Sequence, residues 1–221
     1  YLHYVLDLWV NWWRSHFATG EVVVIRYSDD FVIGFQHERD ARLCLEELRE
    51  RFTRFSLTLH PEKTRLIEFG SLADRHRKRR GDGKPESFDF LGFTHSCSLT
   101  RSGRFSIRRK TIAKRMRAKL ASLKEVLLRC RHAPIPEQGG WLKSVMQGWF
   151  NYYAVPYNSV ALDRFRYWVG RLWWRALRRR SQRARNTLWW SRMGRLIDRW
   201  LPRPKILHPW PNARFAVKYP R

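Results

Sequence analysis

In the first third of the chain, hydrophobic residues are spaced along the sequence as they are in amphipathic helices and in β-strands. Apolar side chains recur every three or four residues over residues 1–17, which predicts an amphipathic helix. Two apolar runs, residues 22–25 and 31–35, flank a short polar segment and predict a β-hairpin whose strands are both buried. A second helix is predicted over residues 38–55. Its inward-facing positions are Leu43, Leu45, Leu48 and Phe52.

Shorter extended segments follow the second helix. Residues 57–59 and 64–69 predict strands on either side of a proline, and residues 88–93 (FDFLGF) predict a compact aromatic strand. Between them, residues 71–86 are polar, basic and glycine-containing, which predicts an exposed loop. A hairpin, a helix and further strands in this order predict an α+β sheet layer.

After Ile107 the pattern is helical throughout. Apolar positions three and four apart predict three helices, which cover residues 112–130, 142–153 and 162–176, and Pro134 and Pro136 are predicted to close the first. A fourth helix over residues 187–201 and an extended proline-rich tail complete the chain. We therefore expect three parts, at residues 1–106, 107–180 and 181–221.

The third of these helices carries a second pattern on the face opposite its apolar stripe. Arginines recur there at helical spacing, with two aromatic residues beside them. Such a face could hold backbone phosphates and stack a base. It also fits a solvated arginine face whose aromatic residues pack on a neighbouring element. The residues are Arg164, Tyr167, Arg171, Trp174, Arg175 and Arg178.

The strong positive charge of the chain limits the kinds of molecule that it is expected to bind. Lys and Arg total 45 against 19 Asp and Glu, a formal net charge of +26, which favours nucleic acid first and an anionic membrane second. The membrane alternative is poor because the arginines and aromatic residues lie on several elements rather than on one long amphipathic helix. The three cysteines are far apart and fit free thiols in a reducing compartment better than a zinc site.

Two adjacent carboxylates, Asp29 and Asp30, stand at the predicted hairpin tip of this strongly basic chain. They repel each other unless a cation lies between their oxygens, and Mg²⁺ takes oxygen ligands of this kind. A two-metal site can drive in-line displacement at a phosphate. Aspartate is also common in turns for backbone reasons alone, but the hairpin would hold both carboxylates rigidly, which favours the metal site.

Six segments resemble, in order along the chain, motifs of group II intron-encoded reverse transcriptases. The first three resemble consecutive blocks of the polymerase palm, the fourth resembles the maturase-specific segment, and the last two resemble the tail of bacterial members. The segments are residues 24–32 (VIRYSDDFV), 57–64 (LTLHPEKT), 88–93 (FDFLGF), 148–153 (GWFNYY), 208–211 (HPWP) and 214–215 (RF).

The resemblance implies an RNA-directed DNA polymerase that also binds group II intron RNA and assists its splicing and mobility. It implies a partial right-hand palm followed by thumb and maturase helices, in a cytoplasmic bacterial protein. Mg²⁺ would be held by Asp29 and Asp30, and the other partners would be an RNA template, a DNA primer and dNTP.

Two further roles come from the same resemblance. Lys63 matches a lysine near the phosphates of the incoming nucleotide, although a lysine at a strand end also reaches solvent without a ligand. The backbone of Phe90, Leu91 and Gly92 would support the primer terminus.

The sequence also departs from the family pattern. In the family, the fingers and a further metal-binding aspartate lie upstream of the position matched by Tyr1. Asp7, in the helix before the hairpin, is therefore expected to be structural. Two carboxylates without a third offer an incomplete cage for two metal ions, so we expect weak or no polymerase activity from this chain alone. The alternative is a non-catalytic RNA-binding splicing factor that uses only the thumb and maturase helices.

Overall fold

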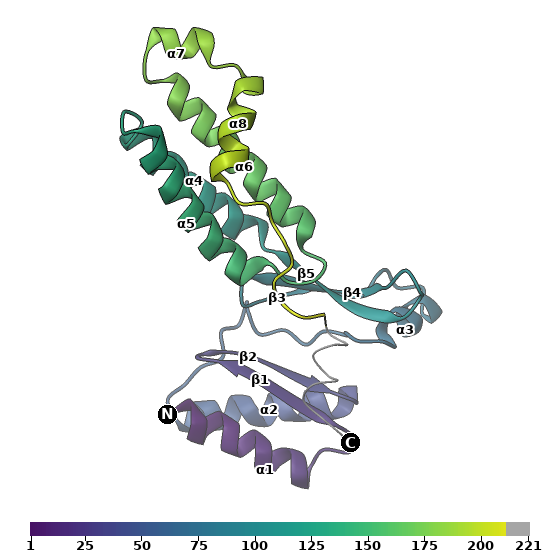
Figure 1. Cartoon of the computed structure of the whole chain (residues 1–221). Helices are drawn as coiled ribbons and strands as arrows, with labels where there is room; N and C mark the ends of the chain where they lie inside the picture. Colours follow the sequence, from purple (N-terminus) through teal and green to yellow (C-terminus); the bar gives the residue numbers. More distant parts are fainter. Residues whose placement is uncertain (211–221) are drawn as a thin grey trace. The chain divides into compact units, whose positions relative to one another are not determined.

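The first 69 residues fold into one unit, in which helices cover one face of a β-hairpin (Figure 1). The structure is a computed structural model that describes residues 1–210. A π-helical turn runs directly into α1, so the predicted first helix is confirmed. The elements of this unit are η1 (His3–Asp7), α1 (Leu8–His16), β1 (Val22–Tyr27), β2 (Asp30–Phe35) and α2 (Glu38–Arg54).

Only one face of the hairpin is buried, so the prediction that both strands are buried was wrong. β1 and β2 pair antiparallel from Val22 opposite Phe35 to Tyr27 opposite Asp30. The side chains of Val22 and Phe35 pack in the core with the two helices, whereas Val23 and Ile25 of β1 are more than half exposed. Successive side chains of a strand point to opposite faces, so an unbroken apolar run leaves one apolar face uncovered here.

α2 has its predicted extent but not all of its predicted inward residues. Leu48 and Phe52 are buried, whereas Leu43 is 38% exposed, and the small side chains of Ala41 and Cys44 take the inner positions. Burial raises the pKa of the Cys44 thiol to about 12, so this cysteine is an inert core residue. Cys97 and Cys130 are also free thiols, as expected.

The strands predicted over residues 57–59 and 64–69 are absent, since both segments are irregular. Between them, the backbone N–H groups of Lys63 and Thr64 both donate to the carbonyl of His60, which forms a turn just after Pro61. The basic segment predicted as a loop contains a short helix, α3 (Ala73–Arg79), whose Asp74 and Lys78 form an ion pair of 2.7 Å one helical turn apart.

The aromatic segment at residues 88–93 is a tight hairpin rather than one strand. β3 (Phe88–Phe90) turns through Leu91 and Gly92 into β4 (Phe93–Leu99), and both turn residues have positive φ, 46° and 81°. β4 then pairs with β5 (Phe105–Thr111), so strand structure extends four residues past Ile107. The order β3-β4-β5 makes a three-stranded antiparallel sheet.

Helices follow the sheet in the second unit, which begins at Gly70 (Figure 1). Pro134 is the N-cap of α5 and Pro136 lies in its first turn, so both prolines begin a helix rather than close the preceding one. The helix predicted over residues 187–201 is confirmed as α8, and a short helix that was not predicted, α7, precedes it. The helices are α4 (Ala113–Arg129), α5 (Ile135–Tyr153), α6 (Ser159–Arg178), α7 (Gln182–Thr187) and α8 (Trp190–Trp200).

The apolar stripe of α6 is broader than predicted. Leu162, Phe165 and Val169 are fully buried as expected, but Leu172 is only half-buried and Trp173 takes the inner position beside it. The Trp173 indole N–H donates to the side-chain oxygen of Gln138 at 2.9 Å. The Gln138 amide in turn donates to three carbonyls of the α4–α5 connection, so this buried polar group is fully satisfied.

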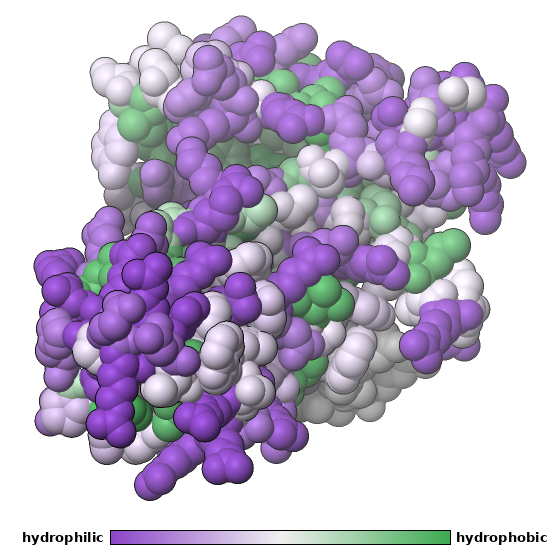
Figure 2. Space-filling model, turned by 90° about the horizontal axis from the view of Figure 1, so that it is seen from above, coloured by the Kyte–Doolittle hydropathy of each residue, from purple (hydrophilic) through white to green (hydrophobic). Residues whose placement is uncertain are grey.

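The α+β fold class is confirmed. The predicted part boundaries after residues 106 and 180 stay predictions. None of the helices in residues 1–210 has both the length and the apolar character needed to cross a membrane. Hydrophilic side chains cover most of the surface visible in Figure 2.

The tail predicted to be extended is irregular from Pro202 to Trp210. The backbone N–H groups of Leu207 and His208 donate to the carbonyl of Ala154. Residues 211–221, with Arg214 and Phe215, lie outside the described residues.

Two neighbouring glycines of α5 offer a matched test of helix packing. A Cβ at Gly139 would lie 2.4 Å from the Trp200 ring of α8, whereas one at Gly140 would meet nothing within 4 Å. We expect Gly139→Ala to destabilise the protein by about 1–3 kcal/mol through overpacking. Gly140→Ala should stabilise it by about 0.5–1 kcal/mol because alanine favours the helix. Urea unfolding of both variants measures this, and equal stabilities would contradict the close α5–α8 contact.

Candidate active site and nucleic-acid interface

The tip of the β1–β2 hairpin exposes both carboxylates. Ser28 and Asp29 form the two-residue turn, and Ser28 has a φ of 57°, in the left-handed region. Asp30 begins β2 opposite Tyr27, so its side chain belongs to the uncovered face of the hairpin. Asp29 and Asp30 are exposed and, within residues 1–210, their carboxylates form neither a hydrogen bond nor an ion pair. Both are therefore available to a cation.

The arginine nearest in sequence is fully engaged elsewhere. Arg26 binds Asp7 through two hydrogen bonds, from Nε to Oδ1 at 2.7 Å and from Nη2 to Oδ2 at 2.6 Å. Its remaining Nη1 donates to the carbonyl of Ser28 at 2.8 Å. Arg26 therefore fastens the turn to the helix before it and leaves the two tip carboxylates without a counter-charge. Asp7 has the structural contact expected of it.

The Asp7–Arg26 pair has a consequence for stability in acid. The hydrogen bond from Arg26 lowers the pKa of the Asp7 carboxyl, although partial burial acts in the opposite direction. Because the folded-state pKa lies below the ordinary value of 3.8, the pair stabilises the fold above that pH and is lost as the pH falls through the folded pKa.

We therefore expect Asp7→Asn to lower the thermal midpoint at pH 7 and to lose less stability than the unchanged protein when the pH falls from about 5 to 2. Thermal melts across this range measure the difference. If the thermal midpoints of the two proteins fell in parallel with pH, the Asp7–Arg26 pair would not contribute to stability. The buried carboxylate of Asp40, whose pKa is also lowered, is common to both proteins and cancels in the comparison.

The part of the chain that the structure describes holds no cluster of three or more His, Cys, Asp and Glu residues able to bind a metal ion. The tip pair is thus a two-carboxylate site. Lys63 lies in the turn after Pro61, is exposed, and makes no side-chain hydrogen bond or ion pair within the described residues. It belongs to the same unit as the tip pair.

The residues predicted to support a primer form the β3–β4 turn in the second unit. The Tyr152 hydroxyl donates to the Leu91 carbonyl at 2.7 Å, and the Ile112 N–H donates to the Gly92 carbonyl at 3.1 Å. A Cβ at Gly92 would lie 3.0 Å from the Tyr153 hydroxyl, so glycine is required both by this contact and by its positive φ. Two tyrosines of α5 thus hold the turn in place.

Three residues of the predicted α6 surface are engaged within the protein. The Arg171 guanidinium lies 4.9 Å from the centre of the Trp174 ring and 5.0 Å from that of Trp190. The Arg178 guanidinium lies 4.8 Å from the centre of the same Trp174 ring and donates to the carbonyl of Arg185. The Arg171–Trp190 contact joins α6 to α8, and the hydrogen bond from Arg178 joins α6 to α7.

The other three predicted residues, Arg164, Tyr167 and Arg175, are exposed. Two aromatic residues that the sequence pattern did not single out lie exposed nearby in the chain, Trp168 at 44% and Trp189 at 64%. The ring of Trp168 contacts that of Tyr167 edge-on at 5.4 Å. An interface on α6 would therefore use Arg164, Tyr167 and Arg175 directly and the remaining residues as support.

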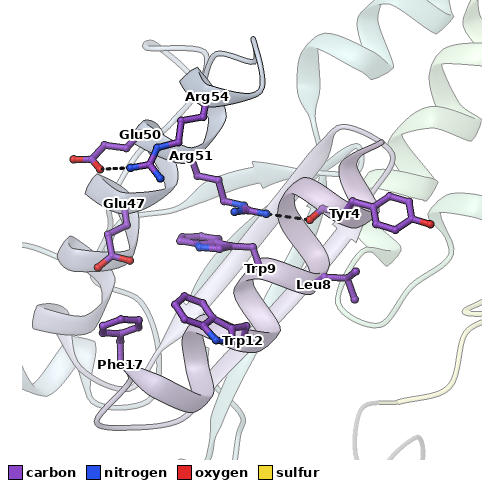
Figure 3. Close-up of a pocket in the computed structure, with 9 residues that line it drawn as sticks. All are labelled: Tyr4, Leu8, Trp9, Trp12, Phe17, Glu47, Glu50, Arg51 and Arg54. Carbon is purple, nitrogen blue, oxygen red and sulfur yellow. Dashed lines mark hydrogen bonds and ion pairs between the residues drawn. The ribbon is translucent and has the colours of Figure 1, made fainter.

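A groove between α1 and α2 is lined by none of the predicted site residues (Figure 3). It has a volume of about 830 Å³, and the rings of Trp9 and Trp12 enter it from α1. Arg51 stacks on Trp9 at 5.7 Å and donates to the Tyr4 carbonyl at 3.3 Å. The groove contains no predicted ligand of a metal or nucleotide.

The segment that contains Asp29 and Asp30 matches a known protein family. Residues 2–95 match the family model described as reverse transcriptase (RNA-dependent DNA polymerase). This part of the chain is similar to reverse transcriptases. The match supports an RNA-directed DNA polymerase at the level of the family, and it includes Asp29, Asp30, Lys63 and the β3–β4 turn. It covers less than half of the chain and ends before β5, so α4–α8 lie outside the matched segment. No curated protein matches the chain.

Proposed function

We propose that this chain is part of a group II intron reverse transcriptase and maturase, an RNA-directed DNA polymerase that also binds intron RNA and assists splicing and mobility. The observation that carries the proposal is the pair Asp29 and Asp30, exposed and uncompensated at a fixed hairpin tip inside the reverse-transcriptase segment. Two adjacent carboxylates repel each other, and a bound cation would offset that repulsion.

The donor set at the tip fits Mg²⁺. This ion commonly binds through one or two carboxylates and substrate phosphates while keeping several waters, and the exposed pair offers that arrangement. When bound, the ion would supply charge stabilisation for displacement at the α-phosphate of a dNTP by a primer 3′-hydroxyl. Arg26, through Asp7 and the Ser28 carbonyl, holds the tip so that both carboxylates stay in position.

The remaining roles are assigned to residues with free polar groups. Lys63, exposed and unpaired within the described residues, would neutralise charge on the nucleotide phosphates. The backbone of Phe90, Leu91 and Gly92 would support the primer, since Tyr152 and Ile112 hold this turn rigid. Arg164, Tyr167 and Arg175 of α6 would bind the intron RNA through phosphate contacts and base stacking.

Primer extension on an RNA template tests the proposal. Because two carboxylates form an incomplete cage for two ions, we expect the 221-residue chain to extend a primer weakly, only with Mg²⁺, and not after chelation by EDTA. Robust synthesis by this chain would contradict the expected weakness. Synthesis that persists in EDTA would contradict the metal assignment.

A second function is favoured by one observation, the absence of a three-ligand metal cluster from residues 1–210. The chain would then be a non-catalytic RNA-binding splicing factor in which the palm segment is only a scaffold. The two functions separate in a splicing assay with intron RNA. Full splicing support from a chain that never extends a primer under any condition would favour the second.

A further inference from the structure

The two faces of the β4–β5 ribbon differ in chemistry. Register pairs Thr94 with Lys110, Ser96 with Arg108 and Ser98 with Ser106. Because alternate residues point to the same side, these six side chains share one face, and it carries only hydroxyls and cations. The opposite face of the same strands carries the apolar and aromatic residues that include Phe93, Cys97 and Ile107.

The polar face is open to solvent and its cations lack counter-charges. Arg108 and Lys110 are exposed, and neither forms a hydrogen bond or ion pair within residues 1–210. The hydroxyls of Ser96 and Ser106 are half-exposed and likewise have no partner in the described part. Positions two apart along β5 are separated by about 7 Å, so the face presents a row of evenly spaced, unsatisfied groups.

One acid limits the extent of this face. Asp89 of β3 lies opposite Thr94 and accepts a hydrogen bond of 2.5 Å from its hydroxyl. A polyanion would therefore follow β4 and β5 rather than cross onto β3, because the Asp89 carboxylate would repel it. Of the groups that remain free, Ser106, Arg108 and Lys110 lie along β5 and Ser96 lies opposite Arg108 on β4. Lys110 shares a row with Asp89, with Thr94 between them.

We infer that this face, the β4–β5 polar face, binds the backbone of a single strand of RNA. The two cations match the charge of successive phosphates. Hydroxyls next to each cation can donate to phosphate oxygens and also accept from the ribose 2′-hydroxyl, a donor that a DNA strand lacks. The inference rests on the proposed function, because an RNA-directed polymerase must hold a strand of RNA, and it adds a site to that function.

Equilibrium binding to a single-stranded RNA oligonucleotide across a range of salt concentrations tests the charged pair. Each phosphate contact to a single strand contributes about 0.7 to the slope of log K against log salt. Arg108→Ala with Lys110→Ala should therefore lower the slope by roughly 1.4. The matched control, Arg39→Ala with Arg49→Ala on α2, removes the same charge from exposed positions elsewhere and should leave the slope unchanged.

The hydroxyls have a separate signature. Ser96→Ala with Ser106→Ala should weaken RNA binding by roughly 3- to 10-fold without changing the salt slope, since no charge is lost. It should also reduce the preference for RNA over a DNA oligonucleotide of the same sequence. Equal binding of both oligonucleotides by the unchanged protein would overturn the assignment to RNA.

A measurement on the unchanged protein guards against variants that fail to fold. RNA carrying 4-thiouridine should crosslink to a peptide within residues 94–110 after irradiation. Crosslinks confined to other segments, or a slope unaffected by the β5 variant but lowered by substitutions on α6, would overturn this inference and leave the proposed function standing. Binding to neither oligonucleotide would overturn both.

Discussion

Replacing Asp29 and Asp30 together by alanine is expected to abolish template-directed nucleotide addition while leaving RNA affinity within about twofold. Both side chains are exposed and free of internal partners, so their loss removes the proposed cation ligands without disturbing the hairpin core. Metal stabilisation of transition-state charge amounts to several kcal/mol, which corresponds to a loss of about 10³-fold or more in rate. Primer extension and RNA binding, measured on the same preparations, check the two halves of this prediction.

Two controls make this experiment specific. Asp29→Asn with Asp30→Asn keeps the shape and turn preference of both residues and removes only their charge, so it should be as inactive as the alanine variant. Glu46→Ala removes an exposed acid of α2 and should keep full activity. Equal loss of splicing support and RNA binding in the alanine variant would show that the acids serve the fold or contact RNA directly.

Binding of RNA by the unchanged protein is expected to fall by roughly 10³–10⁵ between 50 and 200 mM salt, as for a protein that neutralises about 6–10 phosphates. Within that dependence, Arg164→Glu with Arg175→Glu should cause a larger loss than the same reversal at Arg39 and Arg49. Arg164 and Arg175 are exposed on the same helix as the exposed ring of Tyr167.

Arg171 is a poor choice for this test, since its guanidinium packs between two tryptophan rings and its replacement would loosen α8 from α6. Filter binding at several salt concentrations gives both affinity and slope. A flat salt response, or equal losses at the α6 and α2 pairs, would remove the case for a directed surface on α6.

The positions of the helices were predicted from the sequence more reliably than the identities of the side chains that face the core. In α2, the alternation of charged and apolar residues predicted the helix, yet Leu43 is exposed and the smaller side chains of Ala41 and Cys44 are buried. In α6, Trp173 is buried because Gln138 on a distant segment satisfies its indole N–H. No local pattern contains that partner, so the sequence favoured Leu172.

Turns were the least predictable part of the fold. FDFLGF has apolar side chains at four of its six positions, which favours one strand, but Leu91 and Gly92 take positive φ and reverse the chain. The non-glycine residue in that conformation is held by Tyr152 from a helix 61 residues away. The basic segment contains helix α3, in which Asp74 and Lys78 form an ion pair one helical turn apart.

The candidate site shows the same division between local and long-range information. The tip position of Asp29 and Asp30 follows from two apolar runs around a polar dipeptide, and the structure has that hairpin. That the tip carboxylates stay uncompensated follows from Asp7, whose capture of Arg26 joins residues 19 positions apart. The polar face of β4 and β5 required the pairing register, because Ser96 and Arg108 become neighbours only through it.

The grip of α5 on the β3–β4 turn bears on where this molecule could be divided. The similarity to reverse transcriptases stops at residue 95, yet Tyr152 and Tyr153 clasp Leu91 and Gly92 on the other side of that limit. A truncation made at the family boundary would strip the turn of its clasp and expose Phe93, which stacks on Tyr152 at 5.7 Å. The end of the matched segment is therefore not a structural boundary. A force that a bound strand exerts on this turn would be transmitted to α5 through Tyr152 and Tyr153.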